Sequence, residues 1–174
     1  NDGYSIGCGN AVIAITKALV ETGYIKKIEP ETMLRMDVPS GHIISYAKVV
    51  DNEVKSVRFM NVPSFVQELN GVININDYQN ISYDIAFGGA FYAIVSSEEL
   101  DLECKPSNIN KIINLGMEIK DEISNKVDLF HPFDKELNFL YGTIFIDKPS
   151  SKKYHSKNVC VFATIFTSYH LNIV

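Results

Sequence analysis

The chain has 174 residues, of which 46% are hydrophobic and 21% charged, and its net charge at pH 7 is −5. This length allows one sizeable core or two small cores that share a surface. The composition excludes a disordered tail, and the acidic balance argues against a nucleic-acid partner. No apolar run approaches the roughly 20 residues that span a bilayer, so we expect a soluble, cytoplasmic protein with no membrane partner.

The first predicted element is a helix from Asn10 to Thr22, with Gly23 as its stop. Its apolar side chains recur at helical spacing, at Val12, Ile13, Ile15, Ala18 and Leu19. Because this helix is apolar on nearly all sides, we expect it to be buried, with a sheet wrapped around it.

Cys8 lies between Gly7 and Gly9, just before this helix. Unpaired backbone N–H groups and the positive end of the helix dipole gather at such a position. They favour a thiolate that can act as a base or a nucleophile. The alternative, a small residue at a tight turn, stays open at this point. A buried helix would direct the thiol into a sheltered pocket.

Five strands are predicted in the next part of the chain, at residues 32–38, 43–50, 54–61, 64–69 and 72–75. The tripeptide at 39–41 has the chemistry of a hairpin turn, and Asn70-Gly71 is the strongest short hairpin signal in the sequence. Pro63 is expected at a bulge or an edge, where it interrupts the ladder of one continuous meander.

The remaining elements are strands at 81–87 and 90–95, a helix at 107–127 with Ser107 as its N-cap, and strands at 137–146 and 159–163. Gly88-Gly89 indicates a hairpin bend, although a backbone surface lying against a ligand is the alternative. The three cysteines, Cys8, Cys104 and Cys160, are widely spaced and the four histidines are scattered, so we expect no metal site.

Five stretches carry a family resemblance. They are Gly3-Tyr4-Ser5 with Cys8-Gly9, Asn-Val-Pro-Ser-Phe-Val at 61–66, Asp-Ile-Ala-Phe-Gly-Gly-Ala-Phe-Tyr-Ala at 84–93, Phe-Leu-Tyr-Gly-Thr-Ile at 139–144, and Asn-Val-Cys-Val-Phe-Ala at 158–163. In this order they resemble the proline racemase family, and within it the trans-3-hydroxy-L-proline dehydratase branch.

The resemblance implies an α/β fold of two similar half-domains, each a mixed sheet curled around a central helix, as in the diaminopimelate epimerase superfamily. Residues 1–30 would be the end of the first half-domain with its central helix, and 31–163 would be most of the second. Residues 164–174 would be an atypical C-terminal tail. The chain would therefore hold an incomplete pair of half-domains.

The resemblance also implies a small-molecule substrate, proline or a hydroxyproline, and no cofactor. Cys8 would remove the Cα proton, while Gly9 and Asn10 would bind the substrate. Racemases use a second cysteine to reprotonate Cα. Dehydratases carry a threonine there, so that the carbanion expels the 3-hydroxyl and yields an imine precursor of a pyrroline carboxylate.

Two departures from the family pattern bear on activity. The family motif Met-Cys-Gly-His reads Gly7-Cys8-Gly9-Asn10 here, and asparagine cannot titrate as histidine does. After Ala163 the family motif Asp-Arg-Ser-Pro-Cys/Thr-Gly-Thr-Gly is replaced. We expect a truncated or frameshifted chain that is inactive alone. A racemase, a 4-hydroxyproline epimerase or a non-catalytic binding module are alternatives, and a homodimer is left open.

Overall fold

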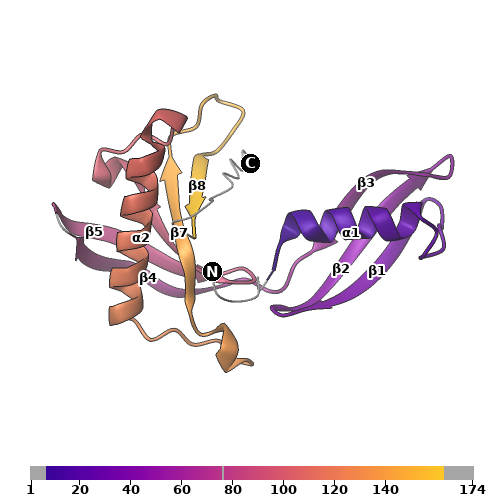
Figure 1. The fold of residues 1–174 in the computed structure, drawn as a ribbon, viewed down its shortest axis with the longest axis horizontal. Helices are drawn as coiled ribbons and strands as arrows, with labels where there is room; N and C mark the ends of the chain where they lie inside the picture. The colour runs from indigo at the N-terminus through magenta and orange to yellow at the C-terminus, as the bar shows by residue number, and fades with distance from the viewer. Residues whose placement is uncertain (1–6, 76, 163–174) are drawn as a thin grey trace. The chain divides into compact units, whose positions relative to one another are not determined.

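The computed structural model describes residues 7–75 and 77–162, which fall into two compact units, 7–63 and 64–162 (Figure 1). Within these ranges, one three-stranded and one five-stranded sheet, with two α-helices, give the mixed α/β architecture that the sequence predicts. The sequence interpretation placed a boundary after residue 30, whereas the compact units separate after Pro63. The assignment of either unit to one half-domain of the family stays a prediction.

The first unit packs one helix on an antiparallel sheet. Helix α1 (Gly9–Glu21) is followed by β1 (Glu31–Val38), β2 (Gly41–Val50) and β3 (Glu53–Met60), in the spatial order β1-β2-β3. The hairpin predicted at 39–41 is confirmed, because Val38 pairs with Gly41 across the turn. Helical periodicity and turn chemistry thus located all four elements to within about two residues.

Only one face of α1 is buried. Val12, Thr16 and Val20 are buried at a spacing of four residues, whereas Ile13 and Ile15 are 39% and 49% exposed. In the described residues the helix is therefore not buried on all sides, as its apolar sequence had suggested. The physical reason is that the three strands of this unit cover a single helix face, where Val20 joins a core of Leu34, Ala47, Val49 and Val54.

A buried hydroxyl pair joins α1 to the sheet. Thr16 Oγ1 donates to the Val12 carbonyl at 2.7 Å and lies 2.8 Å from Ser45 Oγ on β2, and both side chains are inaccessible to solvent. Thr16→Val keeps the side-chain shape but leaves Ser45 Oγ without this partner. We expect the free energy of unfolding to fall by about 1–2 kcal/mol, measured by urea unfolding.

Thr22→Val is the matched control, because Thr22 Oγ1 makes the same kind of bond to the Ala18 carbonyl at an exposed position. The control variant should unfold at the same urea concentration as the parent chain. Equal losses in the two variants would contradict a specific role for the Thr16–Ser45 pair.

The second unit is a five-stranded sheet covered by one helix. Its strands are β4 (Phe65–Ile75), β5 (Tyr78–Phe87), β6 (Phe91–Ser96), β7 (Leu140–Asp147) and β8 (Lys157–Val161), in the order β4-β5-β6-β7-β8. Only β6 and β7 run parallel, and α2 (Ile109–Lys126) lies in the connection between them. A parallel pair requires such a crossover, and Figure 1 shows α2 lying along the sheet.

Short 3₁₀ helices complete this unit, at Ser97–Leu100, Pro106–Asn108 and Lys135–Leu137. The N-cap of α2 is Asn108, so the prediction of Ser107 is wrong by one residue. The hairpin bend at Gly88-Gly89 is confirmed, with Gly89 at a φ of +105° between the antiparallel strands β5 and β6.

The Asn70-Gly71 dipeptide is not a hairpin turn. Strand β4 continues through it, Asn70 has a φ of +56°, and the register against β5 shifts between Glu68 and Gly71. The Asn70 N–H donates to the Asp84 carboxylate at 2.8 Å. The prediction fails because a β-bulge uses the same positive-φ residues as a tight hairpin turn.

The predicted continuous meander is also wrong at Pro63. Strand β3 ends at Met60 and pairs only with β2, whereas β4 begins at Phe65 and pairs with β5 in the other sheet. Proline has no N–H to donate to a ladder. Here it falls between two sheets instead of at a bulge within one.

Helix α2 approaches the sheet closely at Gly116. A Cβ atom at this position would lie 2.7 Å from Cβ of Val161 on β8, and Thr143 Oγ1 on β7 donates to the Gly116 carbonyl at 2.8 Å. From the sequence alone, Gly116 is expected only to weaken the helix slightly. In the fold it allows the helix to contact both strands.

Asp147, at the end of β7, ties three segments together. Its Oδ2 accepts from the Cys104 N–H and from Lys157 Nζ, each at 2.8 Å, and its Oδ1 accepts from the Lys148 N–H at 2.7 Å. Burial alone would raise the pKa of this carboxyl. The ion pair with Lys157 and the two N–H donors outweigh burial and hold the pKa of Asp147 below its ordinary value.

Asp147→Ala should therefore destabilise the chain by about 3 kcal/mol, because it leaves Lys157 and a buried N–H without a partner. Since the folded-state pKa lies below the unfolded one, the contribution is present above about pH 4. It is lost as the pH falls through the folded-state pKa. Urea unfolding at pH 7 and in acid should show this difference. The exposed pair Lys148–Glu98 provides a control, since Glu98→Gln should change neither value.

Candidate active site

Cys8 is the N-cap residue of α1. Its backbone is extended, with φ −143° and ψ 106°, and its carbonyl accepts the first helical hydrogen bond from the Val12 N–H at 3.0 Å. The predicted placement of a thiol at a helix start is confirmed. The N–H groups of the first turn, which begins with Gly9 and Asn10, have no carbonyl one turn earlier inside the helix. They face the side from which an anion would approach.

Cys8, Gly9 and Asn10 are all exposed in the described part of the chain. Two hollows, of about 510 and 390 Å³, belong to residues 97–148 and 124–140 of the second unit, and none of the three residues lines either of them. The expectation of a sheltered thiol is wrong here because α1 is covered on one face only.

Both glycines beside Cys8 contact side chains of the first unit. A Cβ atom on Gly7 would lie 3.2 Å from Ser40 Oγ, and one on Gly9 would lie 3.1 Å from the ring of Phe59. The glycines thus let the backbone on each side of the thiol approach the β1–β2 turn and strand β3. Sequence reasoning did not find Ser40 or Phe59, because nothing in a linear pattern indicates which side chains a glycine approaches.

Ser40 is unusual among the polar side chains of this unit. It is 6% exposed, and its Oγ has no hydrogen-bond partner in the described part of the chain. A buried hydroxyl without a partner costs about 1–3 kcal/mol. This cost is located directly beside the segment that enters the candidate site.

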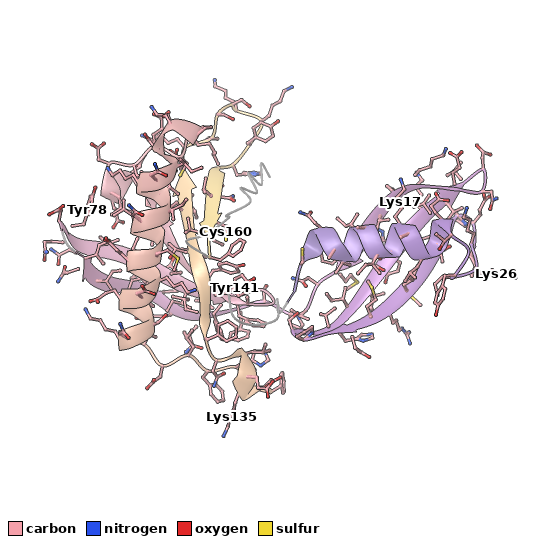
Figure 2. The ribbon with its side chains drawn as sticks, viewed as in Figure 1. Lys17, Lys26, Tyr78, Lys135, Tyr141 and Cys160 are labelled. Carbon is pink, nitrogen blue, oxygen red and sulfur yellow. The ribbon has the colours of Figure 1, made fainter. Side chains whose placement is uncertain are left out.

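Cys104 and Cys160 lie in environments that disfavour the thiolate form. Burial, with a smaller contribution from the Asp147 carboxylate, raises the pKa of Cys104 to about 11. Burial also raises the pKa of Cys160 to about 11, although Tyr92 partly offsets it. Figure 2 labels Cys160 on β8 together with Tyr141 on the neighbouring strand β7. Cys8 is the one exposed cysteine of the three.

The described residues contain neither a cluster of metal ligands nor a helix that could span a membrane. Within 7–75 and 77–162, no group of three or more His, Cys, Asp or Glu side chains has the arrangement of a metal site. None of the helices in these ranges is both long enough and apolar enough to cross a membrane.

The family model and the similar proteins of known name all indicate the same family. The sequence model of the family described as "Proline racemase" matches residues 1–166. A trans-3-hydroxy-L-proline dehydratase of Colwellia psychrerythraea is 43% identical over 163 residues, which are 94% of this chain and 46% of that protein. A 3-hydroxyproline 2-epimerase of Burkholderia multivorans is 36% identical over 163 residues, covering 94% and 49% of the two chains.

A solved structure agrees with these relatives. The hydroxyproline epimerase from Agrobacterium vitis, with bound trans-4-hydroxy-L-proline, superposes with a TM-score of 0.78 at 31% identity. The match covers 86% of this chain and 43% of the epimerase. The chain spans about half the length of the curated relatives it matches. With the helix-start cysteine and the mixed sheets, these matches show that the chain belongs to the proline racemase family.

Proposed function

We propose that this chain supplies one catalytic arm of a trans-3-hydroxy-L-proline dehydratase, with Cys8 as the acceptor of the Cα proton. The observation that carries the proposal is the exposed thiol at the N-cap of α1 in a chain of this family. Gly9 and Asn10, in the first helical turn, would bind the substrate carboxylate through N–H groups that suit an anion.

The chemistry follows from this placement. The Cys8 thiolate removes the Cα proton and becomes a thiol. The electron pair left at Cα forms a double bond to C3 as the C3–O bond breaks, and the hydroxide leaves as water once it is protonated. The ring product is an enamine that tautomerises to a pyrroline carboxylate. Helix N–H groups stabilise the negative charge that develops on the carboxylate side of the transition state.

A hydroxyproline epimerase is the second candidate, favoured by the names of the Burkholderia and Agrobacterium relatives. Both reactions begin with the same proton abstraction, so Cys8 has the same role in each. They differ in the residue that acts on the carbanion. The motif that would supply this residue after Ala163 does not occur in the 174-residue sequence.

Ligand protection tests the proposed site in the chain itself. Pyrrole-2-carboxylate is a planar mimic of the carbanion, and such mimics bind more tightly than substrates. At saturation it should slow the alkylation of Cys8 by iodoacetamide at least about threefold, because the anion occupies the start of α1. Pyrrole lacks only the carboxylate and is the matched control. Equal rates with pyrrole and with pyrrole-2-carboxylate would contradict the proposal.

A further inference from the structure

We propose that Ser40 and Phe59 are positioning residues for Cys8, and that they act through Gly7 and Gly9. The two side chains set the path of the backbone on either side of the thiol and thereby the direction in which the thiol leaves the helix start. This inference rests on the proposed role of Cys8. It assigns a positioning role to two residues that lie outside the stretches that carry the family resemblance.

The first support is the fixed position of Ser40. The residue lies in the turn between β1 and β2, whose ends pair directly at Val38 and Gly41. On the far side of the turn, Gly41 has a φ of +131°, and a Cβ atom there would lie 3.0 Å from Cγ1 of Val62. Ser40 is therefore held in a short paired turn, and a Cβ atom added at Gly7 would lie 3.2 Å from its Oγ.

The second support comes from the other side of the thiol. Phe59 on β3 pairs with Ser45 on β2, and Ser45 is hydrogen-bonded to Thr16 of α1. Directly paired residues face the same side of a sheet, so the Phe59 ring lies on the side of α1. It reaches to 3.1 Å from the Cβ position of Gly9. The buried Thr16–Ser45 pair thus fixes the distance between helix and sheet at which Phe59 meets the helix start.

The third support is the buried Ser40 hydroxyl itself. An alanine would fill the same turn without a buried polar atom, yet the chain keeps an Oγ that has no partner among the described residues. Its position against Gly7 means that any side chain at residue 7 would press on it. Gly7 and Ser40 therefore form a matched pair in which the missing side chain of one accommodates the hydroxyl of the other.

The consequence concerns the geometry of proton abstraction. A catalytic atom displaced by about 1 Å can lose a hundredfold in rate. A side chain placed beside the backbone on each side of Cys8 would limit such displacement at an exposed position. The sheet thereby provides the rigidity that a loop before a helix lacks.

A double-mutant cycle at residues 7 and 40 tests this inference without any ligand. Gly7→Ala places a methyl group against Ser40 Oγ and should slow alkylation of Cys8 by iodoacetamide at least about threefold. Gly7→Ala combined with Ser40→Ala removes the obstacle, and its rate should return to within about 1.5-fold of Ser40→Ala alone. Gly88→Ala is the control, because nothing lies within 4 Å of a Cβ at that glycine.

Two further readouts separate positioning from a general loss of structure. In Gly7→Ala the urea midpoint should stay as in the parent chain, and so should the labelling rates of Cys104 and Cys160. If Gly7→Ala slowed alkylation of Cys8 by the same factor with and without Ser40→Ala, the inference would be overturned. An equal change in the alkylation rates of all three cysteines would also overturn it. Failure of ligand protection would instead refute the proposed function and leave this coupling measurable.

Discussion

A chimera that carries this chain in place of the 43% identical stretch of the Colwellia dehydratase is expected to dehydrate trans-3-hydroxy-L-proline only while Cys8 is present. The relative supplies the second arm, and this chain supplies the thiol at the start of α1. Cys8→Ser should lower turnover at least about a thousandfold, because removal of a residue that makes or breaks a bond costs this much or more. Product formation and release of deuterium from Cα-deuterated substrate measure the effect.

The same chimera tests the departure at residue 10. Asn10→His restores a side chain that can carry a positive charge beside the substrate carboxylate. A hydrogen bond to a charged group contributes about 1.5 kcal/mol, so turnover should rise about tenfold. The 174-residue chain alone should release no deuterium, since its sequence lacks the second motif.

Cys104→Ala is the matched cysteine variant for these assays. Cys104 is buried in the second unit, whereas the residues assigned to the site belong to the first, and alanine keeps its Cβ. The variant chimera should retain turnover once its melting temperature is shown to be unchanged. A folded Cys8→Ser chimera that still turns over substrate would refute the role of Cys8.

Iodoacetamide near neutral pH is expected to alkylate Cys8 at least about a hundred times faster than Cys104 or Cys160 in the chain itself. The two slow thiols have pKa values raised from 9.0 to about 11. A rise of two units lowers the thiolate fraction about a hundredfold. Burial slows the reaction of Cys104 further, because this residue is 3% exposed. Peptide mass spectrometry after timed quenching gives the three rates separately.

Two controls define this measurement. The rates of Cys104 and Cys160 should rise about tenfold for each pH unit until the pH approaches their pKa values. In denaturing urea the three cysteines should react at similar rates, because the fold creates the difference between them. Equal, slow labelling of all three cysteines in the native chain would contradict an accessible, reactive thiol at the start of α1.

Local signals in the sequence predicted most of the secondary structure. The apolar spacing from Val12 to Leu19 and the stop at Gly23 located α1, and the turn residues at 39–41 and 88–89 located two hairpins. These features depend on φ preferences and side-chain periodicity within a few residues. For the same reason, the sequence placed Cys8 at the start of a helix, and its motifs identified the family.

The sequence-based predictions were wrong where the same short pattern is compatible with two different structures. Asn70-Gly71 provides positive φ values for a hairpin or for a bulge, and only the pairing of β4 with β5 selects the bulge. Pro63 interrupts a ladder in either case, and only the partners of β3 and β4 show that it separates two sheets. Strand partners are contacts between distant residues, and no short stretch of sequence contains them.

The sequence by itself determined the family, the elements, and the position of Cys8 between two glycines at a helix start. The tertiary structure alone decided which face of α1 is covered, that Cys104 is buried and Cys160 half-buried while Cys8 is exposed, and that Ser40 and Phe59 lie beside the two glycines. The reason is that backbone preference acts within a few residues. Burial and close approach depend on which distant segments the fold brings together.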